Sequence, residues 1–398
     1  MIASLLLAAL AQTGAPVPAA LPDAPAARAG IDLARSWLLE HQNPDGSWGH
    51  WRAPGAYDAD WSNLETHLAF QAATTGLAVI ALADAAAGAD EPAATWSAWE
   101  RGVDFLCQRA AAIKRPSDWD TDNVWAYSYG LAAMTAAAAH PRLAEPGQRE
   151  RRAAVERTGH RLLELLADYQ TPFGGWAYYA DESLARRPYW TTSFLTAVNV
   201  LGMLDARALG WPVDEARLAR AVEVVKASRL PSGAYVYTFG PFPRPGGLTD
   251  INQVRGSLSR IQVCNLALWR AGRAGFETGV GRPELELGLR QFFGEHRFLD
   301  LAYQRPIPHE SWYSNSGYFY FFGHYYAAGV IEQLEPEARP AQAARLRQHL
   351  LKTQAADGSM FDFAMNQHGR PYGVAFALSA LARTTPPAPP PPDRGGSR

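Results

Sequence analysis

A repeated turn sequence is the feature that most constrains the fold of this chain. Each copy has an amphipathic helix, then a polar residue, three further residues, Gly, any residue and a large side chain. In the four well-formed copies, the polar residue, the glycine and the large residue are Gln42, Gly46 and Trp48; Gln170, Gly174 and Trp176; Arg229, Gly233 and Tyr235; and Gln354, Gly358 and Met360. A long internal repeat predicts an array of similar helical units that share one continuous core.

The spacing of the glycines predicts two further, degenerate copies. Successive glycines lie 128, 59 and 125 residues apart, so two of the intervals are about twice the third. The gaps contain RGVDFLCQRAAAIK, with Gln108 and Ala112 in the repeat positions, and RQFFGEHRFLDLAY, with Arg297, Leu301 and Tyr303. Six copies then follow one another at intervals of 57 to 68 residues. We therefore expect one domain over residues 29–383.

Each copy is followed by a second helix that is apolar on nearly every side, such as LETHLAFQAATTGLAVIALADA. A helix that is apolar all round must be buried. Six helical hairpins achieve this burial by closing into a ring, with the apolar helices inside and the amphipathic helices outside. The turn glycine is expected to take the left-handed conformation that side chains disfavour. The predicted fold is an all-α toroid, an (α/α)6 barrel of six helical hairpins.

The ends of the chain differ in composition from this repeat region. Residues 2–10 are apolar and are followed by small residues, which is typical of a secretory signal. A Pro- and Ala-rich linker is expected up to residue 28, and residues 384–398 form a Pro-rich tail that is expected to be disordered. We therefore predict export to the periplasm or the extracellular space. The net charge of −2 gives no reason to expect a nucleic acid partner.

The turn sequence resembles the Gln-x-x-x-Gly-x-Trp repeat of squalene–hopene and oxidosqualene cyclases, which protein prenyltransferase β subunits share in a looser form. The resemblance covers essentially the whole repeat region, whereas full-length triterpene cyclases contain two such helical domains. It implies membership of the terpenoid cyclase and protein prenyltransferase superfamily, with a central aromatic cavity that binds an apolar, isoprenoid-like ligand. The repeat is specific for the fold and much less so for the activity.

The acidic segment DWDTDN, at residues 118–123, lies just before the second inner helix. Class II terpenoid cyclases carry Asp-x-Asp-Asp at a similar place, and the middle Asp protonates the substrate. The resemblance implies that Asp122 is the proton donor, that Asp120 assists it, and that Asn123 replaces the last acid. From the residues alone, the simpler explanation is that the two carboxylates cap the following helix and complement its dipole. If the protein is an enzyme, protonation-initiated cyclisation is the first mechanism to test.

Aromatic residues gather near the starts of the predicted inner helices. Aromatic faces bind apolar chains by burial and stabilise cations by cation–π attraction. The predicted substrate-binding residues are Trp125, Tyr129, Trp190, Trp312, Tyr318, Phe319, His324 and Tyr372.

A zinc site like that of the protein prenyltransferases is not expected. Those proteins use an Asp and a Cys two residues apart together with a distant His. The corresponding residues here are Gln262, Cys264 and His324, so the carboxylate ligand is missing. We predict neither a metal nor another cofactor.

Two other classes of function remain open. An exported, carbohydrate-active lyase or hydrolase could use Arg255, Arg260, Glu310 or the loop at residues 366–372 in an open groove. A non-catalytic ring that binds a ligand or a protein would need none of these residues. Peripheral contact with a membrane and the oligomeric state are also left open.

Overall fold

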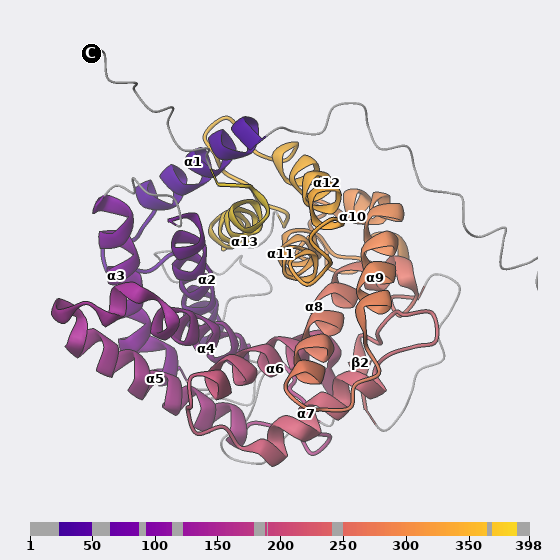
Figure 1. Ribbon diagram of the computed structural model, residues 1–398, viewed down its shortest axis with the longest axis horizontal. Helices are drawn as coiled ribbons and strands as arrows, with labels where there is room; N and C mark the ends of the chain where they lie inside the picture. Colours follow the sequence, from indigo (N-terminus) through magenta and orange to yellow (C-terminus); the bar gives the residue numbers. More distant parts are fainter. Residues whose placement is uncertain are drawn as a thin grey trace, which may run out of the picture.

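The computed structural model describes residues 24–49, 64–86, 93–113, 122–178, 188, 190–240, 250–363 and 368–387. Within these ranges, the long helices alternate along the chain between the outer and the inner layer of a ring (Figure 1). The outer helices are α1 (Ala24–Glu40), α3 (Ala93–Arg109), α5 (Arg149–Asp168), α7 (Glu215–Ala227), α9 (Arg282–Gly294) and α12 (Arg339–Leu351). The inner helices are α2 (Leu64–Ala85), α4 (Val124–Ala139), α6 (Ser193–Ala208), α8 (Val254–Arg273), α11 (Phe319–Ile331) and α13 (Gly369–Thr384).

Short elements connect these helices. They are the helix α10 (Arg297–Ala302), the 3-10 helices η1 (Ala110–Ala112), η2 (Pro141–Ala144), η3 (Pro146–Gln148) and η4 (Trp312–Ser314), and the strands β1 (Thr191–Thr192) and β2 (Thr238–Phe239). The two strands pair antiparallel, with Thr191 opposite Phe239.

The ring is closed. Each inner helix contacts the next inner helix along the chain, and the last, α13, contacts the first, α2. At the same junction, the Gln354 Nε2 donates a hydrogen bond of 2.8 Å to the Gly30 carbonyl. The Arg28 guanidinium also donates to the Pro386 carbonyl, at 3.3 Å. The predicted toroid of six hairpins is therefore confirmed.

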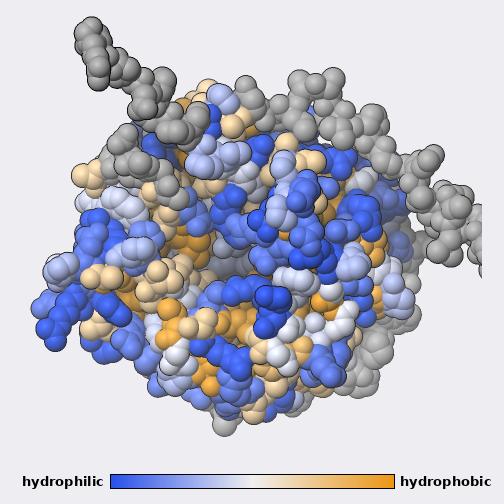
Figure 2. Space-filling view, in the orientation of Figure 1, coloured by the Kyte–Doolittle hydropathy of each residue, from blue (hydrophilic) through white to orange (hydrophobic). Residues whose placement is uncertain are grey.

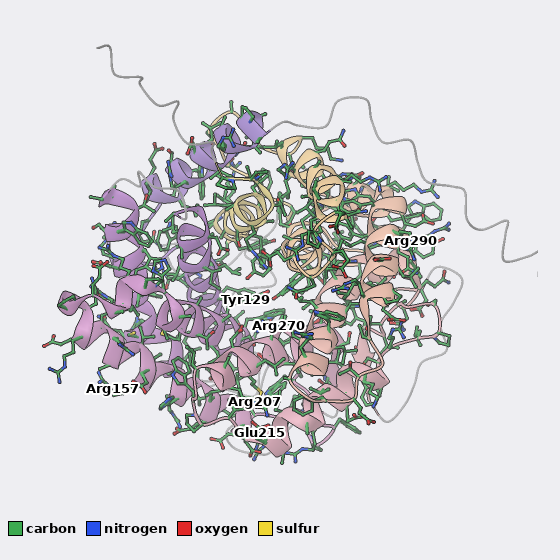
Figure 3. The ribbon with its side chains drawn as sticks, viewed as in Figure 1. Tyr129, Arg157, Arg207, Glu215, Arg270 and Arg290 are labelled. Atoms are coloured by element: carbon green, nitrogen blue, oxygen red, sulfur yellow. The ribbon has the colours of Figure 1, made fainter. Side chains whose placement is uncertain are left out.

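The inner helices supply the core. The stretch Thr66–Ala85 of α2 is long and apolar enough to cross a membrane, but most of it is buried inside the ring. The face of the ring in Figure 2 is covered largely by hydrophilic residues and is hollowed at its centre. In Figure 3, Arg157 and Arg290 lie on the outside of the ring, whereas Tyr129 points into its centre.

The repeated turn connects the outer and the inner helix of one hairpin, and it also contacts the outer helix of the next hairpin. All four well-formed copies place their glycine at positive φ: 88° at Gly46, 94° at Gly174, 85° at Gly233 and 85° at Gly358. The Gln42 side-chain amide donates to the Gly46 carbonyl of its own turn at 2.9 Å and to Ala98 of α3 at 2.8 Å. Gln170 makes the equivalent pair of bonds, the second to α7. The turn thus satisfies its own backbone and a carbonyl of the next outer helix.

The two degenerate copies form hairpins, but their turns differ from the prediction. Ala112 ends the 3-10 helix η1, and Leu301 lies inside α10, so both predicted glycine positions are helical. After α10, the first residue with positive φ is Gln304, at 60°. Because the helix continues past the repeat position in these two copies, the turn comes later in the chain. At the other end of the domain, α1 begins at Ala24, within the segment expected to be linker.

Substitutions at two glycines with positive φ distinguish the cost of backbone strain from the cost of steric overlap. A Cβ at Gly46 would lie 2.5 Å from the Arg101 carbonyl oxygen of α3, whereas Gly210, at φ 75°, has nothing within 4 Å. Gly210→Ala is expected to lower the free energy of unfolding by about 1–2 kcal/mol, which is the strain alone. Gly46→Ala is expected to lower it by about 3 kcal/mol or more, because α3 must also move. Urea denaturation of the full chain measures both, and equal losses would contradict the proposed overlap.

Candidate functional site

A cavity of about 590 Å³ lies at the centre of the ring. Most of its lining side chains are aromatic or aliphatic. The inner helices contribute Phe70 and Leu77 from α2, Trp125 and Tyr129 from α4, Phe194 from α6, Phe319 and Phe322 from α11, and Tyr372 and Phe376 from α13. Residues 306–309 complete the wall.

Helix α4 positions an acid and two aromatic rings on this cavity. Trp125 and Tyr129 are four residues apart and share one face of α4, and Asp122 lies two residues before the helix begins. All three side chains line the cavity. The Trp125 and Tyr129 rings are nearly parallel, with centroids 5.9 Å apart. The Asp122 backbone N–H donates to the Thr66 hydroxyl of α2 at 3.2 Å, which fixes the start of α4 against its neighbour. Among the described lining residues, Asp122 is the one carboxylate.

Phe194 of α6 joins the aromatic side chains into one wall. Its ring centroid lies 6.2 Å from that of Trp125, 5.2 Å from Tyr237 and 5.4 Å from Phe319. The contact with Phe319 is edge-to-face, at 81°. Aromatic pairs prefer offset and edge-to-face arrangements of this kind. Because each ring is held by several others, the cavity wall is preformed.

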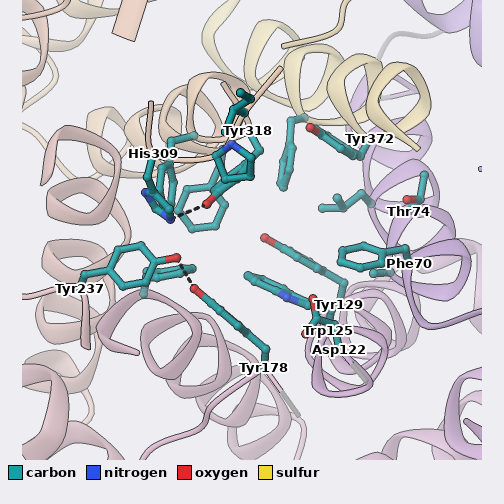
Figure 4. Close-up of a pocket in the computed structure, with 18 of the residues that line it drawn as sticks. Phe70, Thr74, Asp122, Trp125, Tyr129, Tyr178, Tyr237, His309, Tyr318 and Tyr372 are labelled. Atoms are coloured by element: carbon teal, nitrogen blue, oxygen red, sulfur yellow. Dashed lines mark hydrogen bonds between the residues drawn. The ribbon is translucent and has the colours of Figure 1, made fainter. Parts of the chain in front are cut away.

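The His309 imidazole and the Tyr318 hydroxyl lie on the side of the cavity opposite Asp122 (Figure 4). The His309 Nδ1 lies 2.8 Å from the Ser314 carbonyl, which can only accept, so Nδ1 carries the hydrogen. The His309 Nε2 then accepts a hydrogen bond from the Tyr318 hydroxyl at 3.1 Å. The hydroxyls of Tyr178 and Tyr237 are hydrogen-bonded to each other.

These groups are neutral in the folded protein. Burial raises the pKa of Tyr178, Tyr237 and Tyr318, so their hydroxyls keep their hydrogens. Part of the His309 side chain is exposed at the rim of the cavity, but burial of the remainder lowers the pKa of its imidazole. The neutral His309 imidazole is therefore free to accept the hydrogen bond from the neutral Tyr318 hydroxyl.

The loop that carries His309 has an unusual backbone. Among the described residues, the non-glycine residues with positive φ are Gln304, His309, Tyr313 and Ser314, all in this one loop. Each such conformation costs free energy and persists only where the surroundings enforce it. The His309 N–H donates to the Ser316 hydroxyl at 2.8 Å, which helps to hold the loop. Of these four residues, His309 lines the cavity.

Asp362 supports the cavity from behind, and the sequence analysis did not identify it. It is fully buried, and its carboxylate accepts from the Phe321 N–H at 2.9 Å and the Tyr372 hydroxyl at 2.8 Å. Burial raises the pKa of Asp362 to about 7. The available signal was a single acid within the apolar run MFDF at residues 360–363.

Asp362 is expected to make stability depend on pH. Its pKa is raised from 3.8 to about 7, so the folded protein holds this proton more tightly than the unfolded chain. The resulting stabilisation is complete below pH 3.8 and is lost as the pH rises toward 7. Between these values, the free energy of unfolding should fall by as much as about 4 kcal/mol relative to that of Asp362→Asn. Urea denaturation at several pH values measures the difference, and parallel pH profiles would contradict it.

The structure brings together six of the residues predicted from the sequence. Asp122, Trp125, Tyr129, Tyr318, Phe319 and Tyr372 all line the cavity. Asp120 and most of the acidic segment lie outside the described residues. That these residues bind or act on a ligand stays a prediction.

Four predicted residues lie elsewhere, each for a local reason. Trp190 packs edge-on against Tyr178, behind the wall, with ring centroids 5.4 Å apart. Asn123 is fully buried and donates to the Tyr127 hydroxyl at 3.2 Å, away from the cavity. Trp312 lies in η4 and is 63% exposed. His324 is fully buried, but its ring meets His296 of the outer layer.

Of the residues considered for a polar groove, Tyr372 of the loop at residues 366–372 lines the cavity, whereas Arg255, Arg260 and Glu310 do not. Arg255 donates to the Tyr313 hydroxyl and to Glu295. Arg260 is buried behind the wall, 5.2 Å from the centre of the Tyr237 ring, and burial lowers its pKa to about 10. Glu310 is exposed to solvent.

Comparison with known proteins identifies the architecture. No family model matches the chain, and no curated protein is similar to it in sequence. Solved structures, however, match along most of its length. An α-1,6-mannanase variant of Salegentibacter sp., in complex with α-1,6-mannotetrose, is 10% identical, covers 90% of this chain and 98% of its own, and has a TM-score of 0.56. The protein has the fold of an α/α toroid enzyme.

Two further solved structures have different activities on the same fold. The type II terpene cyclase MstE from Scytonema, in complex with geranylgeranyl dihydroxybenzoate, is 14% identical, covers 91% of this chain and 98% of its own, and has a TM-score of 0.50. The unsaturated glucuronyl hydrolase from Streptococcus agalactiae is 14% identical, covers 92% and 93%, and has a TM-score of 0.55. At these identities the similarity shows the fold alone, so the terpenoid cyclases are one of several groups of fold relatives.

Proposed function

We propose that the protein binds an apolar, isoprenoid-like molecule in the central cavity and that Asp122 initiates its cyclisation by protonation. The main support is the chemistry of the cavity lining. A volume of about 590 Å³ is enclosed mostly by aromatic and aliphatic side chains, with one carboxylate among the described lining residues. Cavities of several hundred Å³ are typical of small-molecule sites. Burial of apolar surface, at about 25 cal/mol per Å², would supply the binding free energy.

Asp122 is placed to meet the ligand directly, because it lines the cavity beside Trp125 and Tyr129. An apolar ligand that fills the cavity would exclude water from this carboxyl group.

The proposed reaction is an isomerisation in which one proton enters and one leaves. The carboxyl proton of Asp122 adds to an alkene carbon, and the carbocation is attacked by the next double bond of the same chain. The faces of Trp125 and Phe194 would stabilise the cation by cation–π attraction. Tyr318 takes a proton from the final cation as its own hydroxyl hydrogen passes to the His309 Nε2, along the 3.1 Å hydrogen bond. Exchange of protons with water restores both groups.

Carbohydrate processing is the second candidate, and the hydroxyl and imidazole groups of Tyr178, Tyr237, Tyr318 and His309 favour it. The fold is shared with a mannanase and a glucuronyl hydrolase. Most glycoside hydrolases, however, use two carboxyl groups that flank the scissile bond. Among the described residues, the cavity lining provides one. We therefore favour the apolar ligand.

A direct comparison of ligands tests the proposal. The purified full chain is incubated separately with squalene, a geranylgeranyl phenol, α-1,6-mannooligosaccharides and unsaturated glucuronyl disaccharides. Native mass spectrometry reports binding, and chromatography with mass detection reports products. We expect one isoprenoid bound per chain and a cyclic product of unchanged mass. Cleavage of a saccharide without isoprenoid binding would favour the second candidate and overturn the first.

A further inference from the structure

Three histidines from neighbouring elements meet in the outer part of the ring. His296 precedes α10, His324 lies in α11, and His349 lies near the end of α12. One ring nitrogen from each lies within 4.8 Å of the other two. His296 and His324 are buried, and His349 is half-buried. None of the three lines the central cavity.

The hydrogen-bond partners of two rings determine where their hydrogens lie. The His324 Nδ1 is 2.7 Å from the Tyr320 carbonyl oxygen, which can only accept, so this nitrogen carries the hydrogen. The His296 Nδ1 is 3.1 Å from a carboxylate oxygen of Asp300, whose other oxygen accepts from Lys352 at 2.8 Å. The His296 hydrogen is therefore also on Nδ1. In both neutral rings, Nε2 has a free lone pair.

These two lone-pair nitrogens face each other at 3.0 Å. The contact is repulsive unless a cation lies between them. Zinc bound at about 2.0–2.1 Å in tetrahedral geometry separates its ligand nitrogens by about 3.3 Å, so a small shift of the rings admits the ion. Metal-bound histidines also typically donate their other N–H to a carboxylate or a backbone carbonyl. His296 and His324 already make one bond of each kind.

His349 supplies a third nitrogen. Its Nδ1 is buried and has no hydrogen-bond partner. The ring now stacks on His296, with centroids 3.5 Å apart and an angle of 24° between the planes, so it must rotate to direct a nitrogen at a shared ion. The half-buried position of His349 permits that rotation. Phe292 packs edge-on against His296 and His324 and helps to bury these two rings.

We propose that His296, His324 and His349 bind a zinc-class divalent ion, with His296 and His324 as preformed ligands through Nε2. Imidazole suits zinc, copper and nickel rather than magnesium or calcium, which prefer oxygen. The ion would tie α10, α11 and α12 together across the last two hairpins of the ring. An ion that binds only the folded chain also stabilises it. This inference is independent of the function proposed for the cavity.

The test uses the full chain, stripped with a chelator and then titrated with zinc chloride alone. We expect one ion per chain by equilibrium dialysis and mass spectrometry, a dissociation constant in the micromolar range or below, and a rise in Tm. Cobalt chloride should give the visible absorption of a low-symmetry nitrogen site. His349→Ala removes a ligand, and Asp300→Asn weakens the support of His296. Each should reduce the affinity by at least about 10- to 100-fold.

A matched control is a half-buried histidine elsewhere in the outer layer. His160 of α5 lies on another part of the outer layer, so His160→Ala should bind zinc as the unmodified protein does. His324→Ala would open a cavity in the core, and the test therefore relies on His349 and Asp300. Millimolar binding, or equal affinities in His349→Ala and His160→Ala, would overturn the proposal. A proton would then be the cation shared by His296 and His324.

Discussion

Asp122→Asn is expected to lower the turnover of a cyclisable polyprenoid by about 10²- to 10⁴-fold, the range that general-acid catalysis contributes. The amide keeps the shape of the carboxyl group but cannot donate a proton to an alkene. Because the apolar walls are unchanged, the dissociation constant for the polyprenoid should stay the same. Product formation under saturating substrate and ligand binding by native mass spectrometry measure the two quantities separately.

Asp32→Asn is the matched control for this prediction. Asp32 is an exposed carboxylate on α1, paired with Arg35 at 2.9 Å and remote from the cavity. Its replacement should leave turnover and binding unchanged. If Asp122→Asn forms product as fast as the unmodified protein, Asp122 is not the proton donor, although the cavity could still bind the ligand.

Trp125→Ala is expected to weaken binding of the same polyprenoid by about 10- to 100-fold. This corresponds to about 1.5–3 kcal/mol, the free energy of burying a large apolar side chain. The Trp125 ring lies between Tyr129 and Tyr178, with centroids 5.9 and 6.0 Å away, so its removal also loosens the wall. Binding by native mass spectrometry gives the ratio, and a urea denaturation curve checks that the variant is folded.

Trp312→Ala provides the comparison, because both residues were expected to bind substrate. Trp312 is 63% exposed on η4 and does not line the cavity. Its replacement should leave the dissociation constant within about twofold, since surface changes of this kind are typically small. Equal losses in the two variants would mean that the ligand binds outside the central cavity.

The fold was predictable because its signals are local. A Gln, a Gly and a Trp at fixed spacing specify one turn, and the positive φ at Gly46 is what that glycine is needed for. The apolar second helices required burial, and six of them leave a closed ring as the simplest solution. The turns predicted at Ala112 and Leu301 were misplaced because a degenerate copy has no glycine to mark where the helix ends.

The site was only partly predictable, because it depends on which side of each helix faces inward. Helix α11 is apolar all round, so its sequence does not reveal this side. Phe319 and Phe322 face the cavity, whereas His324, on another face, meets the outer layer. His309 and Asp362 reach the site through tertiary contacts with Tyr318 and Tyr372, which no spacing along the chain reports.

Two predictions remain as they were. Export rests on residues 1–28, of which residues 1–23 lie outside the described part of the chain. The isoprenoid ligand rests on the aromatic cavity and the turn resemblance. The fold relatives do not distinguish it from a saccharide, since a terpene cyclase and a mannanase both share the architecture.

The contact between α13 and α2 also has a consequence during synthesis. A ribosome makes α2 hundreds of residues before α13, its neighbour on one side of the ring. Until the last hairpin emerges, the apolar side of α2 that packs against α13 stays exposed. Non-local contacts of this kind slow folding. Partly made chains with uncovered apolar surface are prone to associate with one another. Nascent chains of this protein should therefore bind chaperones that cover exposed apolar surface until the ring closes.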